Sequence, residues 1–190
     1  MNKLKFITLF FLALTFELFL FFIFHKKIDT TALFVDSRDY QVIALNIINH
    51  GTFSHAENAP YEPSNFRAPL YPLWLGLMYL IFKSFKIALF AGMAIFALAS
   101  PITYLIAEEL FDKKVAWLSG ILFAFEPWAA FLGGTTIMSE QLFVPMFLLS
   151  AYLFIRYLKY NFKGSFYLSA LFFGAATLTR PYLLYFWPII

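Results

Sequence analysis

Cysteine is absent from the 190-residue sequence, and charged residues are few. The lack of cysteine excludes disulfide bonds, cysteine-ligated zinc and thiol nucleophiles. Charged residues make up only 13% of the chain, whereas soluble domains usually carry roughly 25%. So low a charge content argues against a soluble globular domain.

The signature motifs of several enzyme classes are missing as well. The sequence contains no GxGxxG, Walker, HExxH or nucleophile-elbow pattern. Nucleotide hydrolysis, zinc proteolysis and serine-hydrolase chemistry therefore have no support. The net charge of +3 does not indicate a nucleic-acid partner, because lysine and arginine in so apolar a chain report membrane topology first.

Apolar residues, in contrast, are abundant: they form 62% of the chain, and 27 residues are phenylalanine. Because about 20 helical residues cross a bilayer, the sequence predicts an all-α polytopic membrane protein. The last apolar run reaches the final residue, so we expect the N-terminal part of a longer protein with a single transmembrane domain. The expected spans are residues 6–24, 87–107, 115–132, 140–157 and 165–190.

Basic residues predict the orientation of the chain. Lysines near the N-terminus, at 113–114 and in the basic segment 156–163 mark the cytoplasmic side by the positive-inside rule. No small-residue cleavage site follows the first apolar run, which favours an uncleaved anchor over a signal peptide. We expect a multi-pass protein of the plasma (inner) membrane with a cytoplasmic N-terminus.

The same orientation makes residues 25–66 a long extracytoplasmic loop. The apolar run 69–82 is too short to cross the membrane and is expected to be re-entrant or interfacial. An even number of crossings then separates this loop from the polar interval before Glu140. Asp36 and Glu140 are therefore predicted to share the outer face.

The outer loop contains a predicted amphipathic helix. Apolar residues recur at helical spacing from Tyr40 onward, and the helix is expected to run from about Asp36 to His50-Gly51. Asp36 and Asp39 have two interpretations. In the first, Asp36 caps the helix and Asp39 complements its dipole. In the second, Asp36, held ionised by the helix amides, acts as a general base, and Asp39 and Tyr40 are candidates for substrate binding.

Three further segments carry candidate polar residues. Arg67 opens RAPLYP, in which Tyr71 is a further candidate for substrate binding. Arg67 suits bidentate phosphate recognition, although an interfacial arginine can also extend to lipid headgroups. Glu140 begins a span and is either a second acid or a helix-dipole partner. Arg180, inside an apolar stretch, needs an anionic partner unless a short loop exposes it.

Ionisable residues at membrane depth keep a transporter alternative open, namely Glu17, Glu126 and Arg180. Glu17 is either functional or a protonated acid bonded to a neighbouring helix. No inverted repeat is visible, and the polar candidates gather in outer segments, which is atypical of a transport path. A non-catalytic membrane assembly or lipid-binding subunit is the other alternative.

The order of several motifs resembles a known family. The chain is similar to the N-terminal half of lipid-linked-sugar glycosyltransferases of the GT-C fold, in particular the glycosyltransferase family 39-like relatives of protein O-mannosyltransferases and of the lipid A aminoarabinose transferase. The resemblance implies that Asp36, with Tyr40 and Ala44 on one helical face, is the base. It also implies that Arg67 contacts the lipid phosphate and that Glu140 assists. The motifs are DSRDYQVIALNIINHGTFS, RAPLYPLWLGLMYLIF, EELFDKKVAWLSGILFAFEPW, MSEQLF and GAATLTRPYLL.

The resemblance further implies a reaction and its partners. A sugar would pass from a polyprenyl-phosphate donor to a lipid, glycan or protein acceptor hydroxyl on the extracytoplasmic face, among membrane lipids. Arg180 is a second candidate contact for the phosphate. Some relatives have Glu directly before the basic residue, where this sequence has Phe66. No particular metal site is therefore predicted, and a divalent metal cofactor is left open.

Overall fold

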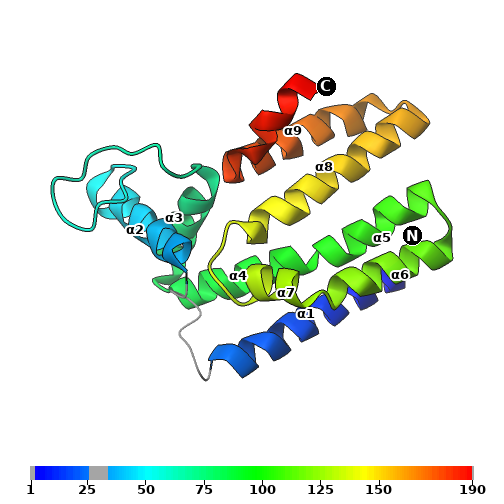
Figure 1. Cartoon of the computed structure of the whole chain (residues 1–190), viewed down its shortest axis with the longest axis horizontal. Helices are drawn as coiled ribbons and strands as arrows, with labels where there is room; N and C mark the ends of the chain where they lie inside the picture. Colours follow the sequence, from blue (N-terminus) through cyan, green and yellow to red (C-terminus); the bar gives the residue numbers. More distant parts are fainter. Residues whose placement is uncertain (1–2, 26–33, 190) are drawn as a thin grey trace.

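The structure, a computed structural model, describes residues 3–25 and 34–189 (Figure 1). Across these ranges the chain is helical and contains no strand. The predicted all-α membrane fold is thereby confirmed, because several of the helices are also long and apolar enough to cross a membrane. In chain order the helices are α1 (Lys3–His25), α2 (Val35–His50), α3 (Leu70–Phe82), α4 (Phe85–Ala97), α5 (Ala99–Leu110), α6 (Lys113–Ala124), α7 (Pro127–Gly134), α8 (Glu140–Tyr160), α9 (Lys163–Thr179) and the 3-10 helix η1 (Pro181–Ile189).

Three candidate membrane spans occur within the described ranges. They are α1, α8 and the combined helix Phe85–Leu110, in which α4 and α5 join at Leu98. The pair α6 and α7 makes a fourth if its two helices, bent by 57°, are taken as one broken span. α3 has only 13 residues and is a shorter apolar helix.

Two of the apolar runs are interrupted at prolines. Run 115–132 is divided between α6 and α7, because Pro127 occupies the first turn of α7 and the Glu126 side chain accepts hydrogen bonds from the amides of Trp128 and Ala129. Run 165–190 is divided between α9 and η1. Arg180 precedes Pro181 and takes extended backbone angles (φ −143°, ψ 117°), as residues before proline commonly do.

The turns next to the basic segments lie at the opposite end of the molecule from α2 and α3 (Figure 1). The N-terminus, the α5–α6 turn and the α8–α9 turn lie at one end. There Lys159 Nζ of α8 bonds Glu109 Oε2 of α5 at 3.0 Å. α2, α3 and the loop between them lie at the other end, near the start of α8. The basic segments and the candidate site are thus separated along the bundle.

α2 is the predicted amphipathic helix, and it is anchored to the bundle. It ends at Gly51, whose positive φ of 66° suits glycine and lets its amide bond the carbonyl of Ile47 at 3.1 Å. Its buried face includes Tyr40, Ile43 and Ala44, as the spacing predicts. Tyr40 and Ala44 share one core cluster with residues of α3, α4 and α8, among them Tyr71, Leu75, Leu89, Met93 and Leu142. Packing therefore fixes the start of α2 beside the start of α8.

Candidate active site

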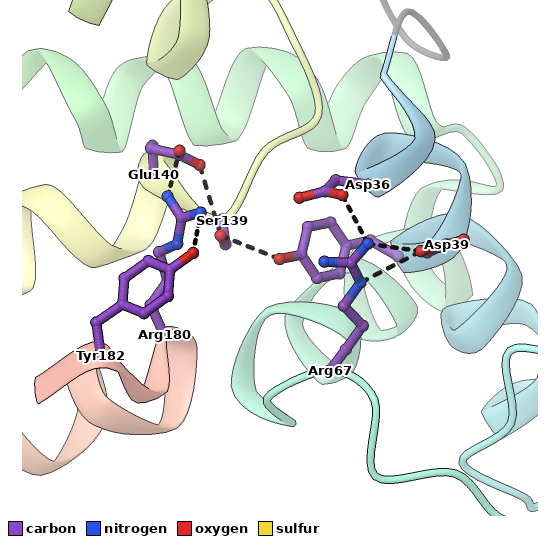
Figure 2. Close-up of polar contacts among 8 residues, drawn as sticks. Asp36, Asp39, Arg67, Ser139, Glu140, Arg180 and Tyr182 are labelled. Atoms are coloured by element: carbon purple, nitrogen blue, oxygen red, sulfur yellow. Dashed lines mark hydrogen bonds and ion pairs between the residues drawn. The ribbon is translucent and has the colours of Figure 1, made fainter. Parts of the chain in front are cut away.

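An arginine held by two carboxylates occupies the mouth of α2 (Figure 2). Arg67 Nη2 donates to Asp36 Oδ1 and to Asp39 Oδ2, each at 2.6 Å. Arg67 Nε donates to the same Asp39 oxygen at 3.3 Å. The guanidinium carbon lies 4.7 Å from the centre of the Phe66 ring and 5.3 Å from that of Tyr40, which fixes the plane of the group.

The capping interpretation of Asp36 is wrong. Phe34 is the N-cap of α2, and no side-chain hydrogen bond caps this helix. Asp36 lies in the first turn, where a carboxylate still complements the helix dipole. Its carboxylate accepts a hydrogen bond from Arg67 Nη2 instead. The sequence could not predict this pair, because the two residues are 31 positions apart.

A second arginine–carboxylate pair lies nearby (Figure 2). Glu140, in the first turn of α8, accepts a hydrogen bond from Arg180 Nη1, at the end of α9. Arg180 also donates to the Tyr182 hydroxyl at 3.4 Å, and its guanidinium carbon lies 5.0 Å from the centre of that ring. Arg180 thus has the anionic partner that the sequence required of it.

Tyr40 and Ser139 connect the two pairs. The Tyr40 hydroxyl donates to Ser139 Oγ at 3.2 Å, and Ser139 Oγ donates to Glu140 Oε2 at 3.5 Å. Burial raises the pKa of Tyr40, although the bond to Ser139 acts in the opposite direction, so its hydroxyl is a neutral donor near pH 7. We call the connected residues the polar cluster: Asp36, Asp39, Tyr40, Arg67, Ser139, Glu140, Arg180 and Tyr182.

Tyr71 lies beneath the polar cluster. It is fully buried, and its ring packs edge-on against Tyr40 with 4.9 Å between ring centres. Its hydroxyl donates to Gln141 Oε1 at 2.7 Å, and Gln141 Nε2 bonds the carbonyl of Leu89 at 3.3 Å. Gly92 leaves the space that the Gln141 side chain fills. Tyr71 therefore packs against the buried side of Tyr40 and does not line an open surface.

Sequence reasoning missed Ser139 and Gln141. Both are fully buried, and they flank Glu140 in sequence: Ser139 is the N-cap of α8, and Gln141 lies in its first turn. The signal available was a serine and a glutamine on either side of a candidate acid at the start of a span. Burying a serine or a glutamine side chain without hydrogen bonds costs free energy. Ser139 and Gln141 were therefore candidates for the site in the same way as Glu140.

An apolar groove of about 550 Å³ runs beside Arg67. One wall is the loop end that precedes α3, and the other is the end of α9 with the start of η1. Arg67 is a polar group in a wall that is otherwise largely apolar. The groove is lined by Phe53, Ser64, Asn65, Phe66, Arg67, Ala68, Pro69, Thr177, Leu178, Pro181 and Leu184.

The electrostatics keep Arg67 charged. Burial lowers its pKa, but hydrogen bonds to Asp39 and Asp36 raise it by more, so the net pKa is raised. The polar cluster contains three carboxylates, Asp36, Asp39 and Glu140, and two arginines. Residues 3–25 and 34–189 contain no group of three or more His, Asp or Glu side chains that could hold a metal ion.

Glu17 and Glu126 lie outside the polar cluster. Glu17 of α1 is 2% exposed and packs against Gly134 of α7, and its Oε2 has no hydrogen-bond partner among the described residues. A carboxyl in such surroundings is expected to be neutral. Glu126 caps α7. Both therefore have structural contacts with α7.

A family model described as dolichyl-phosphate-mannose-protein mannosyltransferase matches residues 66–190, well over half of the chain. The match includes Arg67, Glu140 and Arg180, whereas α2 with Asp36 precedes it. Searches of curated proteins and of solved structures found no match.

Proposed function

The chain belongs to the dolichyl-phosphate-mannose-protein mannosyltransferase family, and from this membership we propose that it moves a sugar from a polyprenyl-phosphate donor to an acceptor hydroxyl on the extracytoplasmic face. Family membership and the apolar helices make it a membrane glycosyltransferase. The donor, the acceptor, the inner membrane and the face of the membrane are parts of the proposal.

One observation carries the proposed donor site: Arg67 stands in the wall of an apolar groove. A polyprenyl-phosphate sugar combines an apolar chain with one anionic phosphate. The groove offers apolar surface for the isoprenoid units next to the phosphate, and a guanidinium is well matched to phosphate oxygens. Arg67 Nη1 has no hydrogen-bond partner within residues 3–25 and 34–189, so a donor remains for the phosphate.

Asp36 is the proposed base. Its carboxylate accepts the proton of the acceptor hydroxyl while the hydroxyl oxygen forms a bond to the anomeric carbon. The bond between that carbon and the phosphate oxygen breaks, and the polyprenyl phosphate leaves with the electron pair. General-base catalysis of this kind contributes about 10²–10⁴-fold to the rate.

Arg67 stabilises the negative charge that develops on the departing phosphate, which is commonly the larger contribution. Glu140 is the proposed second acid and orients the acceptor. Its geometry is held by Ser139 on one side and by Arg180 on the other. Arg180 neutralises Glu140 and is a second candidate contact for the phosphate.

The proposal is tested by the release of free polyprenyl phosphate. Membranes that contain the full gene product are offered a panel of polyprenyl-phosphate sugars, and Arg67→Ala is compared with Arg38→Ala. Arg38 is an exposed arginine of α2 paired with Glu57 at 2.6 Å. We expect donor-dependent release that Arg67→Ala abolishes and Arg38→Ala retains. Release from no donor, with the protein folded and present in the membrane, would refute the proposal.

A further inference from the structure

The two carboxylates hold Arg67 unequally. Asp39 accepts from both Nε (3.3 Å) and Nη2 (2.6 Å), whereas Asp36 accepts from Nη2 alone (2.6 Å). The Asp36 side chain is also more exposed, at 32% against 20% for Asp39. Asp39 therefore has the firmer hold on the guanidinium, and Asp36 can leave it by losing a single bond.

The arrangement is already rich in negative charge before any donor arrives. One nitrogen of Arg67, Nη2, is shared between two carboxylates. A phosphate that binds the same guanidinium adds a third anion to a partly buried site, where like charges repel more strongly than in water. The repulsion is relieved if the carboxylate with the weaker hold moves away.

We infer that Asp39 is the positioning residue that aims Arg67, and that the donor phosphate displaces Asp36 from Nη2. The inference rests on the proposed function. One phosphate oxygen binds Nη1, which has no protein partner among the described residues, and a second phosphate oxygen replaces the Asp36 oxygen on Nη2. No covalent bond changes in this step. The rings of Phe66 and Tyr40 hold the guanidinium plane while the exchange occurs.

The exchange orders the reaction. While Asp36 is paired with Arg67, its carboxylate is occupied by the guanidinium. After displacement, the carboxylate is available to the acceptor hydroxyl. The base thus becomes free only when a donor phosphate is in place, and the two aspartates, three positions apart on one helix, have different tasks.

The experiment measures binding of farnesyl phosphate, a short isoprenyl phosphate without sugar, to the full gene product in detergent. Asp36→Asn removes one negative charge beside Arg67 without removing the Asp39 contacts, so binding is expected to become tighter by about threefold or more, while transfer is lost. Asp39→Asn leaves the guanidinium without its two-point partner, so binding is expected to weaken by about tenfold. Asp39→Glu is expected to recover part of that loss.

Steady-state kinetics separate positioning from a merely structural effect. Asp39→Asn should chiefly raise the donor KM, and Asp36→Asn should chiefly lower kcat. Glu57→Gln breaks the exposed Arg38–Glu57 pair, which lies outside the polar cluster, and serves as the control with unchanged affinity. Thermal melting of each variant establishes that it is folded.

The possible failures are distinguishable. Equal weakening of binding by Asp36→Asn and Asp39→Asn would overturn the inference alone, because both aspartates would then aim Arg67. Unchanged binding in Asp39→Asn would do the same. If the wild-type protein does not bind farnesyl phosphate, or if Arg67→Ala binds it equally well, the proposed function fails and the inference fails with it.

Discussion

At the scale of single residues, Tyr40 has the most varied contacts in the polar cluster. Its ring lies beneath the Arg67 guanidinium and against Tyr71, and its hydroxyl donates to Ser139. The helical spacing of α2 was enough to predict that Tyr40 faces inward. Its partner Ser139 could not be predicted, because it is 99 positions away and a single sequence does not say which loops meet.

Tyr40→Phe isolates the hydroxyl. The substitution keeps the ring and removes the hydrogen bond to Ser139, so we expect a loss of about 1 kcal/mol in the free energy of unfolding. Tyr40→Ala also removes the ring and should cost about 3–5 kcal/mol. Thermal melting in detergent measures both variants. Equal losses in the two would mean that the ring contributes nothing to packing.

The charged residues illustrate a further limit of sequence reasoning. Helix spacing places Asp36 and Asp39 near the start of α2, and the motif RAPLYP draws attention to Arg67. Nothing in the sequence shows that the two aspartates contact Arg67. Each aspartate could serve the helix dipole alone, and Arg67 could extend to lipid headgroups. The fold brings them together by returning the loop onto α2, where His55 bonds Ser64 at 2.9 Å and Asn46 bonds the carbonyls of Ser54 and Ala56 at 2.8 Å.

At the scale of elements, the packing of α7 helps to fix the position of the segment that leads to Ser139 and Glu140. α7 packs against α1 and α4, and its glycines allow a close approach. A methyl group at Gly134 would lie 2.6 Å from Glu17 Cγ. The buried segment 135–139 follows directly and leads to Ser139 and Glu140. The fit of α7 against α1 therefore helps to fix the second half of the polar cluster.

Gly134→Ala tests this fit. The added methyl group overpacks the contact with Glu17, and we expect a loss of about 1–3 kcal/mol in the free energy of unfolding. Gly174 in α9 is the matched control, because a methyl group there meets nothing within 4 Å, so Gly174→Ala should be neutral or stabilising.

A second substitution identifies the cause. Glu17→Gly removes both the Cγ atom at 2.6 Å and the Cβ atom at 2.7 Å that the new methyl group would strike, so Gly134→Ala should cost less in that background than in the wild type. Thermal melting of the single and double variants gives the coupling between the two sites. Purely additive changes would show that Glu17 is not what limits the space at Gly134.

Element boundaries were predictable only in part. The 3.6-residue period located α2. Three of the apolar runs, 6–24, 87–107 and 140–157, overlap candidate spans, whereas α9 in run 165–190 is not among the candidate spans of the described residues. The breaks were harder to predict, because Glu126-Pro127 and Arg180-Pro181 stand inside runs whose hydropathy continues on both sides. Proline at those positions is the local signal for a helix start. Hydropathy alone therefore predicts one continuous helix where the backbone has a break at each proline.

At the scale of the whole molecule, the places of three basic segments suggest an orientation. The segments near the N-terminus, at 113–114 and at 156–163 lie at the end with the α5–α6 and α8–α9 turns, whereas the polar cluster lies toward the other end, where the α3–α4 junction with Lys83 and Lys86 also lies (Figure 1). With the positive-inside rule, this arrangement favours a cytoplasmic basic end and an extracytoplasmic site. The orientation was proposed from the sequence by counting crossings, and it remains a prediction.

Single cysteines test the orientation, because the chain has none of its own. Asn58→Cys places a thiol on the exposed loop after α2, and Phe111→Cys and Phe162→Cys place one at each turn of the basic end; all three sites are exposed. A membrane-impermeant thiol reagent added to intact cells should label the first variant alone. The other two should react only after permeabilisation. Labelling of Asn58→Cys and Phe111→Cys from the same side would contradict the proposed topology.

In the proposed function, Asp36 is the base of a lipid-linked-sugar transfer. The most direct measurement is the rate at which the full gene product releases free polyprenyl phosphate from its donor, for the wild type, Asp36→Asn and Glu57→Gln. We predict that Asp36→Asn lowers the rate by at least about 10²-fold and melts close to the wild type, while Glu57→Gln releases at the wild-type rate. Release by folded Asp36→Asn at the wild-type rate would show that Asp36 is not the base.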